Sequence, residues 1–274
     1  MTLSTLMVQL DMDSPAENRL KAALDLAGRF EAELIAFAAA DHRIHLPYEG
    51  GRAVAEAQRA RKEEIASRLK ELHQTFLDMA GDGAGTTWIG KFGHPTELLA
   101  LHARSADMIV VGTPRQAEIL ERDRRIDVGK LVLAAGRPVL VLDGEETAPS
   151  AQTVIVAWKD AREARRAVAD ALPLLKAAKR VIVASVVENA EEPAREGCMA
   201  VVRHLMHHGV KAEESLLPPS RSPAADAVMR LANEVGADLI VSGGYGHSRL
   251  REWAFGGVTR SLMHHGSVAR LLSN

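Results

Sequence analysis

The chain carries one strand-like pattern twice, as Ala106-Asp107-Met108-Ile109-Val110 and again as Ala237-Asp238-Leu239-Ile240-Val241. Two earlier stretches also return, each 148 residues later: Leu6-Met7-Val8 as Val154-Ile155-Val156, and Leu34-Ile35-Ala36 as Ile182-Val183-Ala184. Repetition at this scale indicates two similar units in tandem. The offset falls to 131 at the first pattern, so about twenty extra residues lie in the first unit, between Ala40 and Pro95. We expect them to form the loop 41–51 and a longer helix after it.

Short Val- and Ile-rich runs alternate with longer amphipathic stretches in both units, which is typical of an α/β fold. Between two such runs, Ile65, Leu69, Leu72 and Phe76 recur at steps of four, three and four, as on one face of a helix. The strand-like runs have few polar interruptions, as expected for parallel strands covered on both faces. Each unit is therefore predicted to be a doubly wound, five-stranded parallel sheet.

The polar stretch 143–150 contains Gly and Pro and separates two strand-like runs, so we divide the chain into domains 1–147 and 148–274. The run Ser267–Leu272 carries Arg270 where the first unit has Leu140. A charge inside a strand is a device that discourages further strand pairing. The last strand is therefore predicted to lie at an edge.

Composition excludes several classes of protein. The chain is 47% hydrophobic and 26% charged, so it has ample material for folded cores, and its single cysteine cannot form an intrachain disulfide. A net charge of −2 argues against a nucleic-acid binder. No apolar run reaches the ~20 residues that a membrane span needs, and the start lacks a basic export signal. We expect a cytoplasmic protein.

The strongest local motif follows the fourth strand of the second unit: Gly243-Gly244-Tyr245-Gly246, nine residues, then Gly256-Gly257-Val258-Thr259. Ligands of parallel α/β sheets bind beyond the carboxyl ends of the strands. Glycines let the backbone approach a phosphate, and a glycine pair that opens a helix offers free N–H groups and the positive end of the helix dipole. The alternative is that these glycines only form a turn and a helix cap.

With this motif, the whole chain resembles a tandem member of the universal stress protein family. The family's nucleotide motif is Gly, two residues, Gly, nine residues, Gly and then Ser or Thr; Gly243, Gly246 and Gly256 match it, while Gly257 takes the Ser/Thr position. The resemblance extends to Ala157-Trp158-Lys159-Asp160 and to Gly136-Arg137-Pro138-Val139-Leu140-Val141.

The resemblance implies Rossmann-like domains packed as a pseudo-dimer, with the strand near Pro138–Leu142 beside the strand near Val268–Leu272. It also implies a stress-response or signalling module that binds an adenine nucleotide, ATP before AMP or ADP, with Mg²⁺ as an optional companion. The phosphates would contact Gly243, Gly246, Gly256, Gly257, Val258 and Thr259, and adenine would lie near Ala157, Trp158 and Val186. A homodimer is a further expectation, whereas the downstream protein partner is unknown.

Two departures from the family pattern bear on the nucleotide. ATP-binding members carry an Asp after the first strand, where the second unit has Lys159 with Asp160 beside it. The first unit keeps that acid as Asp11, but it has Arg115 and Ile126 at glycine positions and Asp127 at the hydroxyl position. A carboxylate at the start of that helix would repel a phosphate. We therefore predict that only the second unit binds nucleotide.

Two other functions stay open from the sequence. One is a ligand-free dimerisation or scaffold protein. The other is an adenylating enzyme of the PP-loop group, because residues 242–248 are similar to Ser-Gly-Gly-x-Asp-Ser; however, this loop follows the fourth strand and lacks the Asp. We find no catalytic residues and no metal set, although weak ATPase activity stays open. Within each of the pairs His207-His208 and His264-His265, the two side chains are expected to face different ways on a helix, so the pair is not expected to share a metal ion. Cys198 is expected to be inert.

Overall fold

A computed structural model describes residues 2–13, 15, 17–43, 51–81, 85–113, 124–142, 149–187, 191–218, 224–244 and 268–274. Within these ranges, no helix has the length and apolarity that crossing a membrane would require.

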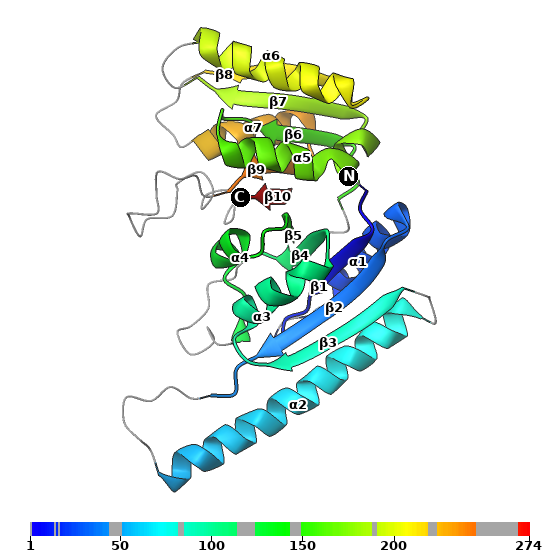
Figure 1. Ribbon diagram of the computed structural model, residues 1–274, viewed down its shortest axis with the longest axis vertical. Coiled ribbons are helices and arrows are strands. Elements are labelled where there is room, and N and C mark those ends of the chain that lie inside the picture. The colour runs from blue at the N-terminus through cyan, green and yellow to red at the C-terminus, as the bar shows by residue number, and fades with distance from the viewer. Residues whose placement is uncertain are drawn as a thin grey trace.

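All described strands belong to one ten-stranded sheet with the order β3-β2-β1-β4-β5-β10-β9-β6-β7-β8 (Figure 1). The strands of the first half are β1 (Thr5–Gln9), β2 (Glu33–Ala40), β3 (Thr86–Phe92), β4 (Met108–Gly112) and β5 (Val139–Leu142). Those of the second half are β6 (Thr153–Ala157), β7 (Arg180–Val186), β8 (Ala212–Leu217), β9 (Leu239–Gly243) and β10 (Ala269–Ser273). The two halves repeat one strand order, which confirms the predicted tandem α/β fold.

The two halves meet where β5 pairs with β10 in antiparallel register, with Leu271 opposite Leu140 and Leu272 opposite Val139. Every other strand pair in the sheet is parallel. The predicted pseudo-dimer, joined through the last strand of each unit, is therefore confirmed. Because the joint is antiparallel, the carboxyl ends of the strands lie at opposite edges of the sheet in the two halves.

Helices cover both faces of the sheet. The described helices are α1 (Glu17–Phe30), α2 (Arg52–Ala80), α3 (Pro95–His102), η1 (Ala103–Ser105), α4 (Val128–Ala134), α5 (Arg162–Ala177), α6 (Glu191–His207) and α7 (Ala224–Val235). One apolar core packs α1, α2, α5 and α6 on the same face and runs through both halves. The opposite face packs α3 and α4 in the first half and α7 in the second.

The expected extra length of the first half is present in α2, which has 29 residues against 17 in α6. Its predicted inner face is confirmed, since Ile65, Leu69, Leu72 and Phe76 are the buried residues of this helix.

The prediction for Arg270 is wrong. Strand β10 lies between β5 and β9, and Arg270 is only 1% exposed. The charge does not mark a sheet edge, because pairing between the two halves covers β10 on the side that a single unit would leave open. The edges of the described sheet are β3 and β8. The predicted boundary between 147 and 148 falls within residues 143–148, which lie outside the described ranges, and it stays a prediction.

Candidate functional site

The carboxyl ends of β6, β7 and β9 bring three of the predicted site residues to one edge of the second half. Ala157, the last residue of β6, pairs with Ala184 of β7 and with Ser242 of β9. Val186 ends β7, and Gly243 ends β9. All three, Ala157, Val186 and Gly243, are half-buried, so each contributes surface at this edge.

Trp158, the next residue after β6, belongs to the core. It is 8% exposed, and its indole lies against Gly197 of α6, where an added Cβ would come within 3.1 Å of Nε1. Its backbone N–H donates to the Ala184 carbonyl at 2.7 Å, which extends the strand ladder by one bond. Packing is therefore the main role of the indole.

Two glycines of the motif allow close approaches of the main chain. A Cβ on Gly243 would lie 2.7 Å from the backbone nitrogen of Ala164, so the first turn of α5 rests directly on this strand end. A Cβ on Gly244 would lie 2.9 Å from Val132 of α4, which belongs to the other half of the molecule. Gly244 also accepts a hydrogen bond from the Asn274 side chain at 2.7 Å. Gly244, the residue after β9, is thus packed against both halves.

Charged groups surround this edge. Lys159 and Asp160 are exposed after β6, and Asp160 accepts a hydrogen bond of 2.7 Å from Arg165 in the first turns of α5. The Arg162 guanidinium reaches Asn274 at 3.4 Å. Three cations, Lys159, Arg162 and Arg165, therefore stand near two carboxylates, those of Asp160 and of Glu163 beside Gly243, a small positive excess that favours an anionic ligand.

The remaining predicted contacts lie outside the described residues. These are the later positions of the glycine motif and their neighbours: Gly246, Gly256, Gly257, Val258 and Thr259. Of the first unit's departures, Arg115 also falls outside, whereas Ile126 and Asp127 are described.

The corresponding edge of the first half is filled by its own side chains. Arg19 of α1 donates to the Gln9 carbonyl at 2.8 Å, to the Gln9 side chain at 2.9 Å and to Asp11 at 2.8 Å. The guanidinium stands where a Cβ on Gly112 would be. The side chains of Arg19 and Asp11 are only 10% and 23% exposed. The acid that the family resemblance assigns to a nucleotide is thus held by an internal cation.

A second arginine closes the same edge. Arg124 forms ion pairs with Asp13 at 2.7 Å and with Glu64 of α2 at 2.9 Å, and its side chain is 12% exposed. Its hydrogen bond to Glu64 raises the pKa of the guanidinium, and the same contact lowers the pKa of that carboxyl. Asp127 caps α4 by accepting a hydrogen bond from the Lys130 N–H at 3.0 Å. The predicted carboxylate at this helix start is confirmed.

Sequence reasoning missed the Arg19 network, although the repeat contained a signal for it. At the offset of 148, Gln9 aligns with Ala157, Asp11 with Lys159 and Arg19 with Ala167. In the second half, each side chain of the network is therefore replaced by one that cannot form the same hydrogen bond. Ala167 is buried within α5 and carries no polar side chain.

In the part of the chain that the structure describes, the cysteine and the histidines that the sequence raised as candidates show no sign of a functional site. Cys198 is fully buried, and burial raises the pKa of its thiol to about 11, so it is protonated at neutral pH. The rings of His204 and His208 lie 4.6 Å apart. Over the described ranges, no group of three His, Cys, Asp or Glu residues is placed to hold a metal ion.

Comparison with solved structures identifies the fold class. A universal stress protein from Archaeoglobus fulgidus DSM 4304 superposes over 100% of this chain and 97% of its own, with a TM-score of 0.74 and 16% identity. A protein of unknown function from Pseudomonas aeruginosa PAO1 covers 99% of this chain and 92% of its own, with a TM-score of 0.61 and 17% identity. The fold is therefore that of tandem universal stress proteins.

The sequence gives independent support. The model of the universal stress protein family matches residues 3–126, which confirms the resemblance stated above. The match falls on the first half, whereas the glycine motif lies in the second. A universal stress protein in complex with cAMP shares 26% identity over 45% of this chain and 96% of its own, with a TM-score of 0.39. No curated protein sequence matches the chain.

Proposed function

We propose that the chain is a nucleotide-binding regulatory protein that holds one adenine nucleotide in its second half, at the carboxyl edge of β6, β7 and β9. ATP is preferred over AMP and ADP. Adenine lies near Ala157, Trp158 and Val186, and Gly243 begins the loop that carries the phosphates. The phosphate contacts continue at Gly246, Gly256, Gly257, Val258 and Thr259.

The contrast between the two halves carries this proposal. In the first half the Arg19 guanidinium covers Gly112 and neutralises Asp11, so a ligand would have to displace three hydrogen bonds. In the second half the aligned residues are Ala157, Lys159 and Ala167, which lack the groups for that network, and it is the Glu163 side chain that lies against Gly243. The carboxyl edge of the strands is thus occupied by Arg19 in the first half, whereas in the second half it carries a glycine motif and cations.

The proposed role is regulatory, with nucleotide occupancy reporting cell state from the cytoplasm. The described edge offers an exposed lysine, Lys159, a carboxylate, Asp160, that is paired with Arg165, and a second carboxylate, Glu163, beside Gly243. We propose binding and assign no catalytic step to this edge, with domains 1–147 and 148–274 as the working division.

Calorimetry on the full chain tests the proposal, with ATP, ADP and AMP titrated in the presence and absence of Mg²⁺. We expect saturable ATP binding that Gly246→Asp abolishes, because the new carboxylate would face the phosphates. Gly28→Asp is the matched control: the same change on an exposed position of α1 that has open space around it should leave binding unchanged. Absence of binding at about millimolar ATP would favour the ligand-free scaffold instead.

A further inference from the structure

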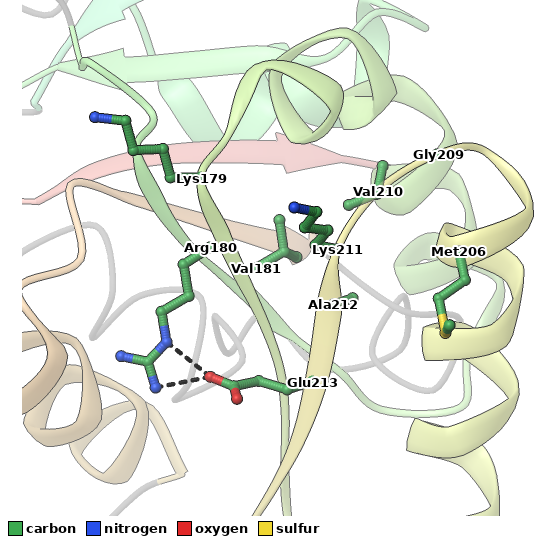
Figure 2. Close-up of a pocket in the computed structure, with 9 residues that line it drawn as sticks. All are labelled: Lys179, Arg180, Val181, Met206, Gly209, Val210, Lys211, Ala212 and Glu213. Atoms are coloured by element: carbon green, nitrogen blue, oxygen red, sulfur yellow. Dashed lines mark hydrogen bonds and ion pairs between the residues drawn. The ribbon is translucent and has the colours of Figure 1, made fainter.

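A shallow cavity of about 500 Å³ opens on the second half, at the amino ends of β7 and β8 (Figure 2). This is the opposite edge of the half from the proposed nucleotide site, since these strands are parallel and the predicted contacts lie at their carboxyl ends. The volume is within the range of about 300–1,000 Å³ that small-molecule sites occupy. The cavity is therefore independent of the function proposed above.

The base of the cavity is apolar. Val181 of β7 and Val210 before β8 are 1% and 3% exposed, and both contribute to the lining. Met206, in the last turn of α6, stands at the rim and is 62% exposed. Gly209 has a positive φ of 80° and turns the chain from α6 toward β8, which brings Met206 beside the strand ends. A ligand seated here would cover mainly the exposed side chain of Met206.

The mouth of the cavity is cationic. Arg180 is neutralised by Glu213, whose carboxylate lies 2.7 Å from the guanidinium. Lys179 and Lys211 are both exposed, and none of the described carboxylates forms an ion pair with either. Figure 2 shows the Lys211 side chain among the lining residues, between Val181 and Val210, whereas the Lys179 ammonium points away from them. Lys211 thus places one unbalanced positive charge at the opening, and Lys179 adds a second farther out.

We propose that this cavity is a second ligand site and that it takes a small organic anion, one carboxylate or phosphate group on a short apolar body. The apolar body would lie mainly against Met206, and the anionic head would contact the ammonium group of Lys211. An inorganic anion would gain only the second contact, and a neutral apolar molecule only the first. The two together give the site its selectivity.

The experiment is an NMR titration of the ¹⁵N-labelled full chain with hexanoate, hexyl phosphate, inorganic phosphate and hexanol. We expect saturable shifts at the amides of residues 179–181 and 209–213 with hexanoate or hexyl phosphate. Whichever binds more tightly identifies the head group. Inorganic phosphate and hexanol should each bind at least about tenfold more weakly. Absence of saturation by both organic anions at about 10 mM would overturn the proposal.

Lys211→Met tests the charge while it keeps the length of the apolar stem, and the exposed position leaves the core intact. We expect it to weaken binding of the better organic anion about five- to tenfold. Lys70→Met, at an exposed position of α2 in the other half, is the matched control and should change nothing. Equal effects of the two variants, or shifts spread over the whole surface, would contradict a defined site.

Discussion

Removal of the Arg19 guanidinium should destabilise the first half far more than removal of an exposed arginine. In Arg19→Ala, the Gln9 carbonyl, the Gln9 side chain and the Asp11 carboxylate all lose a donor. Asp11 keeps a hydrogen bond of 2.9 Å from the Gln9 amide, so its charge is left with one neutral partner. The space above Gly112 is emptied at the same time.

The size of the loss follows from the exposure of the pair. Removing one partner of a fully buried ion pair costs about 3–5 kcal/mol, because the other charge is left buried without compensation. The Arg19 and Asp11 side chains are 10% and 23% exposed, so water can recover part of that cost. We expect a decrease of about 2–3 kcal/mol in the free energy of unfolding.

Urea unfolding monitored by circular dichroism measures this change. The control is Arg52→Ala, which removes an ion pair with Glu56 whose side chains are 92% and 59% exposed and should cost less than about 0.5 kcal/mol. Both arginines lie in the first turn of a helix, so differences in helix propensity cancel. A loss from Arg19→Ala no larger than that from Arg52→Ala would refute the structural role assigned to this network.

Three further predictions concern single residues. Gly243→Ala should destabilise the fold by about 1–3 kcal/mol, since its Cβ would meet the backbone of α5, whereas Gly28→Ala, with open space around it, should stabilise α1 by about 0.5–1 kcal/mol; urea unfolding measures both. The hydrogen bonds from Arg43 lower the pKa of buried Asp41 from 3.8 to about 2. The ionised carboxylate therefore stabilises the fold fully above pH 3.8, and this stabilisation is lost as the pH falls toward 2. Asp41→Asn should therefore make the free energy of unfolding depend less on pH between 3.8 and 2. The Cys198 thiol, with its pKa raised to about 11, should resist iodoacetamide at pH 7.5 in the folded protein and react once urea unfolds it; rapid labelling of the folded chain would contradict its burial.

The sheet could be predicted from sequence because local patterns determine it. The repeat fixed the number of units, and the helical spacing of Ile65, Leu69, Leu72 and Phe76 identified the inner face of α2. The pairing of β5 with β10 followed from the family resemblance, whereas its antiparallel direction became evident only in the structure. Arg270 was misjudged because its burial depends on the strands of two different halves, which no local pattern shows.

The candidate site was less accessible to sequence reasoning. Pairing of Arg19 with Gln9 and Asp11 depends on how α1 packs against β1, and spacing along the chain does not encode that contact. The cavity beside Lys211 lies at the amino ends of strands, whereas the rule for parallel sheets directs attention to their carboxyl ends. Its residues come from three elements that only the fold brings together.

Native mass spectrometry of the full chain with ATP tests the central claim most directly, because it counts nucleotides on each molecule. The contrast between the halves predicts one ATP per chain, complete loss in Gly246→Asp, and one ATP per chain again in Arg52→Ala. Two nucleotides on each chain would show that the first half binds ATP despite Arg19, and one that persists in Gly246→Asp would show that the site does not depend on the glycine motif; either result would contradict the assignment.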